Sequence, residues 1–322
     1  MQRRTTMGLT PDSYQSVRYA NGQRIMSADR LMELAAEVGA AGAHGGMNDI
    51  SFDWARRARR MKEELDMYLE IQTFLPRPDV GEFEHAVKVA KEAGATSLRV
   101  VCLLGRRYEL MQSLDDWKQA VAGYHRQIEA ALPIVERHKM PLGIENHKDW
   151  RVDQQVALLE RYSSEYLGVC LDTGNNLAVL DDPVETVEKL APYTCNVHFK
   201  DMAMEECDEG FLLSEVPLGE GMLDIPRIVD IIRKARPDVR FSLEMITRDP
   251  LLVPCLTDRY WASFDDDNGG RDLARMLTRI RGRQNATPLP RIAGLDADQR
   301  RSLEDEMVDR SIRYARERLG LG

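Results

Sequence analysis

Four apolar segments of the chain each carry one side chain that can bind a metal ion, at or near the carboxyl end of the segment. In chain order they are GIENH with Glu145, VCLDTGN with Asp172, NVHFKD with His198 and FSLEM with Glu244. Short apolar runs of this kind are typical of buried β-strands. Two glutamates, one aspartate and one histidine form a mostly hard, oxygen-rich donor set. Such a set suits Mn²⁺ best, with Mg²⁺ or Co²⁺ as alternatives, and leaves coordination positions for a substrate.

A divalent ion held by these four residues would act as a Lewis acid toward carbonyl and hydroxyl oxygens. It would stabilise the negative charge of an enediolate or enolate, while a carboxylate a few ångströms away removes or returns a proton on carbon. Glu145 and Glu244 are therefore predicted to serve both as metal ligands and as the acid/base pair.

Residues just beyond the ligands extend the predicted site. Residues two apart on a strand point to the same face, so Lys200 is predicted to enter the site with His198 as a catalytic group; a solvated loop lysine is the alternative. Asp201 is expected beside it, near His198. His147, in the ENH segment, is predicted to be a proton donor or substrate contact, and a structural histidine is the alternative. Asn175, three beyond the aspartate, is predicted to bind substrate.

Three polar residues end earlier apolar runs and are predicted to bind substrate: His44, Glu70 and Arg99. An arginine inside an apolar run needs an anionic or polar partner. A substrate carboxylate or phosphate would serve for Arg99, and so would an internal salt bridge to Glu70.

These side chains need a scaffold that brings distant strand ends together. Short apolar runs alternate with helical periods, which gives eight strand–helix units in roughly 280 residues, and this alternation favours a parallel sheet. Eight repeats predict closure into an α/β fold of the (β/α)8 TIM-barrel type, whose active site lies at the strand carboxyl ends. A doubly wound open sheet is the alternative, but its ligands gather at one switch point and not on four neighbouring strands. Residues 1–284 are assigned to the barrel and 285–322 to a C-terminal helical extension.

Two long connections and the C-terminal segment stand outside the regular repeat. Residues 199–223 and 245–269 each follow a strand that ends in a candidate ligand, and we expect both to be loops that cover the substrate. An amphipathic helix is expected from about 295 to 322. It either packs on its own barrel or forms a contact in a homo-oligomer.

The composition narrows the class of partner and the compartment. The formal net charge is −9, which disfavours binding to nucleic-acid backbones. Five scattered cysteines without a Cys-x-x-Cys pair indicate reduced thiols of a cytoplasmic protein. No segment has the length and apolarity of a membrane span or of a signal-peptide core, so no membrane association is expected.

The segments GIENH, GVCLDTGN, NVHFKD followed by PLGEGMLD, and FSLEM resemble those of the xylose-isomerase-like TIM-barrel superfamily of sugar isomerases and epimerases. The resemblance covers roughly residues 6–284. It implies that Glu145, Asp172, His198 and Glu244 bind Mn²⁺, Mg²⁺ or Co²⁺ and that the two glutamates are the acid/base pair. Asn175 stands where the ketose epimerases usually carry a histidine. The ENH segment and the long final loop are more similar to a branch that acts on oxidised sugars. That branch includes 3-oxoisoapionate decarboxylase and lyases of 3-keto-glycosides.

Four functions follow from these observations. The first is a metal-dependent isomerase or epimerase of a ketose or keto-sugar. The second is a decarboxylase or lyase of a 3-oxo sugar or sugar acid, in which the same enolate forms but a different group leaves. An abasic-site endonuclease is disfavoured because its zinc cluster needs many histidines and this chain has six. The fourth is a barrel that binds a sugar-like ligand without catalysis.

Overall fold

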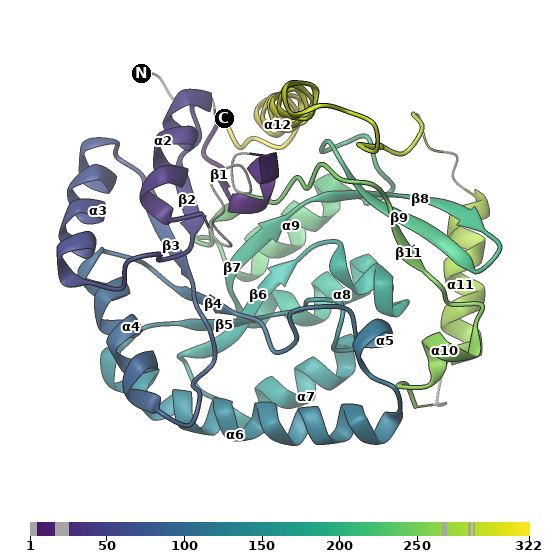
Figure 1. Cartoon of the computed structure of the whole chain (residues 1–322), viewed down its shortest axis with the longest axis horizontal. Coiled ribbons are helices and arrows are strands. Elements are labelled where there is room, and N and C mark those ends of the chain that lie inside the picture. Colours follow the sequence, from purple (N-terminus) through teal and green to yellow (C-terminus); the bar gives the residue numbers. More distant parts are fainter. Residues whose placement is uncertain (1–4, 17–25, 266–268, 283–284, 286) are drawn as a thin grey trace.

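Eight parallel strands close into a barrel at the centre of the molecule (Figure 1). The computed structural model describes residues 5–16, 26–265, 269–282, 285 and 287–322. Around the barrel the strands follow the order β1, β10, β7, β6, β5, β4, β3, β2, and every neighbouring pair is parallel. Their bounds are β1 Gly8–Leu9, β2 Gly42–Gly45, β3 Tyr68–Gln72, β4 Leu98–Val100, β5 Leu142–Glu145, β6 Leu167–Asp172, β7 Thr194–Phe199 and β10 Phe241–Leu243. The predicted (β/α)8 barrel is confirmed.

Helices follow the strands and surround the barrel (Figure 1). Polar side chains cap several of these helices: Asp182, for example, accepts hydrogen bonds from the backbone N–H groups of Val184 and Glu185 at the start of its helix. The helices around the wall are α2 Ala28–Val38, α3 Phe52–Glu64, α4 Val80–Glu92, α6 Leu114–His138, α7 Val152–Tyr162, α8 Pro183–Leu190 and α9 Ile225–Ala235. Short helices are η1 Pro11–Tyr14, α5 Arg107–Leu110, η2 Asn175–Val179, η3 Ala191–Tyr193 and α10 Asp258–Trp261.

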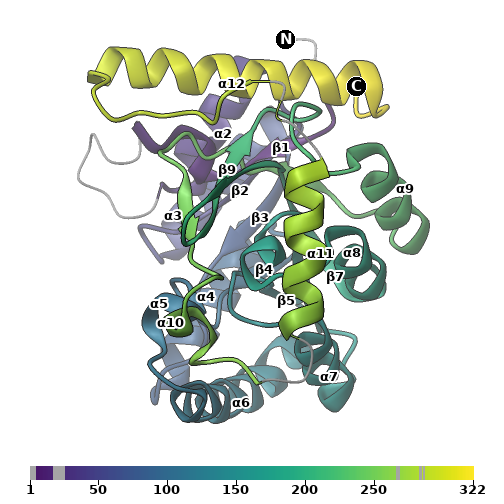
Figure 2. The ribbon, with the colours of Figure 1, turned by 90° about the vertical axis from the view of Figure 1, so that its right-hand side faces the viewer.

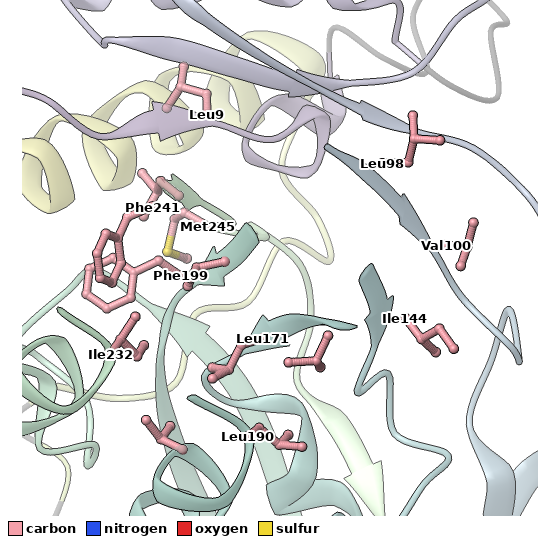
Figure 3. Close-up of a cluster of buried hydrophobic side chains, with 14 of the residues drawn as sticks. Leu9, Leu98, Val100, Ile144, Leu171, Leu190, Phe199, Ile232, Phe241 and Met245 are labelled. Carbon is pink, nitrogen blue, oxygen red and sulfur yellow. The ribbon is translucent and has the colours of Figure 1, made fainter. Parts of the chain in front are cut away.

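Alternation along the strands separates an apolar wall from a polar interior. On β6, Leu171 faces outward toward Leu190 of α8, as Figure 3 shows. On β7 and β10, the rings of Phe199 and Phe241 lie outside the barrel with centroids 5.2 Å apart. Residues one step along each strand point the other way. The inward positions therefore carry Glu145, Asp172 and His198, which explains why these apolar runs contain one ionisable residue each.

The amino-terminal end of the barrel interior is filled by one aromatic ring. The Tyr68 hydroxyl donates to the carbonyl oxygen of Phe241 at 2.9 Å and lies 3.0 Å from Oγ of Ser242. A Cβ atom on Gly8 or Gly42 would lie 2.1 Å and 2.4 Å, respectively, from the nearest Tyr68 atom. The two glycines thus make room for the ring, which fills this end of the barrel interior.

The expectation that 199–223 and 245–269 are irregular loops is wrong. They contribute a second, antiparallel sheet in the order β11, β9, β8, formed by β8 Asp201–Cys207, β9 Gly210–Val216 and β11 Leu251–Val253. Gly210 closes the β8–β9 hairpin at a φ of 150°, and its Cβ would lie 2.2 Å from the Val253 carbonyl oxygen. The pairing partner of β9 comes from a distant part of the chain, so periodicity within either segment could not reveal it.

The C-terminal helix, α12 (Ala297–Arg318), lies along the outside of the barrel near β1 and crosses the top of Figure 2. Its buried stripe joins the main core through Met307, Val308, Ile312 and Ala315. Arg233 of α9 donates to the Leu319 carbonyl oxygen at 3.1 Å. The expectation that this helix packs on its own barrel is confirmed. The preceding helix, α11 (Gly269–Gly282), lies against β8 instead. In the described part of the chain, no helix has both the length and the apolarity that crossing a membrane requires.

Candidate metal and active site

The four predicted metal ligands converge at the carboxyl end of the barrel. One donor atom from each of Glu145, Asp172, His198 and Glu244 lies within 4.8 Å of the other three. Nδ1 of His198 is 3.3 Å from Oε2 of Glu145 and 3.2 Å from Oε1 of Glu244. All four side chains are buried. Strands β5, β6, β7 and β10 are consecutive around the barrel, and their carboxyl ends therefore deliver the four groups to one place.

The chemistry and spacing of these groups fit a divalent cation. Ligands about 2.1 Å from an octahedral ion lie roughly 3 to 4.2 Å from one another, and the four donor atoms here all lie within 4.8 Å of one another, close to that spacing. Neither ring nitrogen of the buried His198 has a hydrogen-bond partner among the described residues. A buried imidazole is normally satisfied, and a metal ion between His198 and the carboxylates would supply the missing partner.

Cationic side chains keep the glutamates ionised. Lys200 lies 2.8 Å from Oδ2 of Asp172 and also forms an ion pair with Glu244. Arg99 forms an ion pair with Glu145. Burial would raise the pKa of Glu244, but Lys200 and His198 hold it well below its usual range. Arg99 and His198 lower the pKa of Glu145 against the same effect of burial. The structure thus places Lys200 among the ligands; its part in catalysis stays a prediction.

His147 and Asn175 both border the ligand cluster. Nδ1 of the half-buried His147 lies 3.0 Å from the Leu103 carbonyl oxygen, to which it donates. Burial lowers the pKa of His147 to about 4, so the ring is neutral near pH 7 and its other nitrogen can accept a hydrogen bond. Asn175 donates to Oε1 of Glu145 at 3.0 Å. It therefore orients a predicted ligand, and whether it also binds substrate is untested.

The residues predicted on earlier strands lie on two levels. The expected alternative of an Arg99–Glu70 salt bridge is wrong, because Arg99 is level with Gln72 on the neighbouring strand and pairs with Glu145. Glu70 lies deeper, where its Oε2 is 3.4 Å from Nδ1 of His44. Burial raises the pKa of Glu70 to about 8. It also lowers the pKa of His44 well below the usual range, so both are neutral near pH 7. Their predicted contact with substrate remains a hypothesis.

Asp201 does not support His198 as expected, because its carboxylate binds a turn of the chain instead. Its carboxylate accepts hydrogen bonds from the backbone N–H groups of Gly219 at 3.0 Å, Gly221 at 2.9 Å and Leu223 at 3.2 Å. Gly219 has a φ of 84°, and its missing Cβ leaves room for the ring of Tyr314 on α12. Asp201 thus fixes the PLGEG turn, and the correction follows because the side chain after an inward-pointing Lys200 points outward.

Three charged residues of the site were missed by sequence reasoning: Lys148, Glu215 and Arg248. Glu215, on β9, is fully buried and binds Arg248 through two hydrogen bonds of 3.1 and 2.6 Å. It also lies 4.0 Å from Nζ of Lys200. Lys148 is 5% exposed and donates to Oδ1 of Asn175. Burial, together with Lys200 and Arg248, lowers the pKa of Lys148 to about 8. Lys148 directly follows the ENH segment, and that proximity was the available signal.

A second group of soft donors lies next to the first. His44, Cys170 and His198 also have donor atoms within 4.8 Å of one another. The two imidazole rings meet edge to face with centroids 4.7 Å apart. Because His198 belongs to both groups, a single ion bound to it would be coordinated either by the oxygen-rich set or by the set that contains sulfur. Hard ions favour the carboxylates.

This barrel and site define the class to which the protein belongs. A family model described as xylose isomerase-like TIM barrel matches residues 32–279, and the chain belongs to this family. A solved structure of a xylose isomerase-like TIM barrel protein from Mycobacterium smegmatis in complex with magnesium aligns with a TM-score of 0.57 at 14% identity. The alignment covers 87% of this chain and 100% of that one.

Two curated proteins are similar in sequence. The 3-oxo-isoapionate decarboxylase of Pectobacterium atrosepticum is 34% identical over 119 residues, which cover 36% of this chain and 43% of that protein. The uncharacterized protein YihM of Escherichia coli is 25% identical over 191 residues, which cover 56% of this chain and 54% of that protein. The chain thus matches about half the length of these relatives.

Proposed function

We propose that this protein is a divalent-metal-dependent enzyme that removes CO₂ from an oxo sugar acid. The charge balance of the buried site carries this proposal. Four carboxylates face four cations: Glu145, Asp172, Glu215 and Glu244 against Arg99, Lys148, Lys200 and Arg248. A divalent ion would add two positive charges in a region of low dielectric. An anionic substrate compensates this excess, and a neutral sugar does not.

The local similarity to 3-oxo-isoapionate decarboxylase supports the same reaction class, although it spans less than half of either chain. The oxygen-rich donor set supports Mn²⁺ as the resident ion, with Mg²⁺ or Co²⁺ as alternatives. Lys200, buried between Asp172 and Glu244, supports an anionic transition state because it adds a fixed positive charge to the site.

The chemistry divides between the ion and the side chains. A bound divalent ion would supply Lewis-acid stabilisation of negative charge on substrate oxygens. The bond between the carboxylate carbon and its neighbour breaks, CO₂ leaves, and the electron pair stays on the sugar as an enolate. The carbon then takes up one proton, which comes from solvent because Glu145 and Glu244 are ionised at rest, and these two carboxylates are the groups that can relay it. Arg99 and Lys200 hold these two glutamates in place.

An isomerase or epimerase is the second candidate, because the two glutamates approach from different sides. Glu145 lies on β5 and Glu244 follows β10, with β6 and β7 between them. Two carboxylates that face one substrate from opposite sides could remove a proton on one face and return it on the other. This arrangement serves a ketose as well as a sugar acid.

One panel assay separates the two candidates. Purified protein with Mn²⁺ is incubated with 3-oxo aldonates and with ketoses in D₂O. CO₂ release is measured for the first set, and NMR follows deuterium exchange at carbon in the second. Metal-dependent CO₂ release supports the proposal. Exchange into ketoses without CO₂ release supports the isomerase. Metal-loaded protein that does neither would refute both.

A further inference from the structure

Lys148 is a buried cation without an anionic partner. Its side chain is only 5% exposed, and among the described residues no carboxylate oxygen lies within 4.0 Å of its ammonium group. The ammonium donates instead to the neutral amide oxygen of Asn175. A buried charge without a counter-ion is strongly unfavourable. The protein therefore retains this lysine at a cost to its own stability.

A second ammonium group shares the same acceptor. Nζ of Lys200 lies 3.3 Å from Oδ1 of Asn175, the oxygen to which Lys148 donates. Asp172 and Glu244 form ion pairs with Lys200, whereas no carboxylate among the described residues is in ion-pair contact with Lys148. Two like charges at one amide oxygen repel each other. An anion at this point would relieve that repulsion and satisfy Lys148.

The backbone of Lys148 is held in an unfavourable conformation. Its φ is 80°, in the left-handed region that favours glycine. Hydrogen bonds on both sides fix the segment: the side chain of Asn146 pairs with the backbone of Asp172 at 2.8 Å, and Asp149 accepts the backbone N–H groups of His147 and Trp150 at 3.1 and 2.9 Å. Strain of this kind persists where surrounding structure over-determines it, and it gathers at ligand-binding positions.

We propose that Lys148, with Lys200 behind it, forms the subsite that receives the carboxylate of the substrate. The inference rests on the proposed function and adds to it the residue that binds the negatively charged group of the substrate. Lys148 lies next to the ligand cluster through Asn175, which also bonds Glu145. A carboxylate bound there stands beside the carbon on which the glutamates act. The protein thereby selects oxidised sugars over neutral ones.

The test compares Lys148→Asn with wild type, because asparagine tolerates the left-handed backbone and removes the ammonium. Lys139→Asn is the matched control: Lys139 also has a positive φ, of 50°, but is exposed. Isothermal titration of Mn²⁺-loaded protein measures binding of D-erythronate, D-arabinonate and D-gluconate, each paired with its alditol. Wild type should bind at least one aldonate tenfold or more tightly than its alditol. Lys148→Asn should lose that preference while it still binds Mn²⁺ and the alditols, and Lys139→Asn should behave as wild type.

Stability gives an independent measurement. Without metal or ligand, the unfolding midpoint of Lys148→Asn should not fall below that of wild type or of Lys139→Asn, because no carboxylate in the described part of the chain is in ion-pair contact with the Lys148 ammonium. A lower midpoint, or an unfolded variant, overturns the subsite, because it shows that the ammonium has a partner. So does an aldonate preference that survives in Lys148→Asn or is absent from metal-loaded wild type, although the latter leaves the metal-dependent function standing. Wild type that binds no Mn²⁺ overturns the proposed function itself.

Discussion

Glu70 and Glu244 are two buried carboxyl groups in the same barrel interior, with exposures of 1% and 4%, yet their ionisation differs. Glu70, on β3, has a serine hydroxyl and a neutral imidazole for neighbours, and burial raises its pKa to about 8. Glu244, after β10, lies against Lys200 and His198, and its pKa falls well below the usual range. Depth alone therefore does not decide the charge of a buried acid; the placement of counter-ions does.

The difference divides the interior into two functional regions. The ends of β5 and β10 present the ionised carboxylates of Glu145 and Glu244, which can bind a cation together with Asp172 and His198. His44 and Glu70, on β2 and β3, form a neutral layer beneath them. Ionised carboxylates are the form that a divalent metal requires. The predictions below test this contrast.

The largest effect is expected when a ligand loses its charge. On our proposal Glu244→Gln removes a metal ligand and a proton-transfer group together, so turnover of the substrate found in the panel should fall at least ~10³-fold. The matched variant Glu70→Gln keeps the neutral form that the carboxyl already has near pH 7 and should retain turnover within a few-fold. Steady-state kinetics with Mn²⁺ measures both. Equal losses of turnover in the two variants would contradict the proposed difference between the ionised Glu244 and the neutral Glu70.

Lys200→Met should destabilise the metal-free protein by about 3–5 kcal/mol, because it leaves Asp172 and Glu244 as buried charges without their partner. Added Mn²⁺ should restore much of this loss, since the ion replaces the ammonium as counter-charge. Chemical denaturation with and without Mn²⁺ measures both numbers. Lys189, which pairs with Asp153 and Glu185 at the surface, is the control, and Lys189→Met should cost about 1 kcal/mol or less. Similar costs at the two lysines would mean that the buried ion pairs of Lys200 contribute no more to stability than the surface ion pairs of Lys189.

Glu70→Gln should stabilise the metal-free protein increasingly as pH rises. The unfolded chain releases the Glu70 proton above about pH 4.5, whereas the folded chain keeps it until about pH 8. Wild type therefore loses stability between these two values, and glutamine does not. The advantage of the variant should grow by about 3 kcal/mol between pH 5 and pH 8, at about 1.4 kcal/mol per pH unit. Denaturation curves at pH 5, 6.5 and 8 test it, and a constant difference between variant and wild type would show that Glu70 ionises normally.

The smallest effect concerns the hydroxyl that faces Glu70. Ser97 Oγ donates to Oε1 of Glu70 at 3.4 Å and accepts from Asn196 at 2.8 Å. Ser97→Ala should cost about 1 kcal/mol. The cost should be greater above pH 8, where the hydroxyl serves the ionised carboxylate, than at pH 6. The same denaturation series detects this difference. A cost that does not change with pH would mean that the Ser97 hydroxyl stabilises the protein only through its hydrogen bond with Asn196.

Much of the barrel and the convergence of the four candidate ligands could be predicted because both follow from local pattern. An apolar strand with one inward acid, as in GIENH, identifies the strand, the direction of Glu145 and the end of the barrel together. Lys200 could be placed in the site because residues two apart on a strand point to the same face, and His198 points inward. The expectation for Asp201 was wrong, because the next residue along points the other way, toward the PLGEG turn.

What could not be predicted depends on pairing between distant segments. Glu215 enters the site only because β9 pairs with β8 and β11, and both faces of β9 are largely buried, so its sequence shows no alternation of polar and apolar residues. The conformation of Lys148 is set by Asn146 and Asp149, whose partners were not visible in the sequence. Arg248 becomes interpretable once Glu215 is placed.

Titration of metal-stripped protein with Mn²⁺, followed by electron paramagnetic resonance, tests the central claim most directly. Four carboxylate and imidazole donors that meet around one ion predict one Mn²⁺ per chain in wild type. Binding should persist in Cys170→Ser, which alters only the neighbouring soft group, and should be lost in Asp172→Asn and Glu244→Gln. Binding that survives in both of these variants, or that disappears in Cys170→Ser alone, would contradict the account.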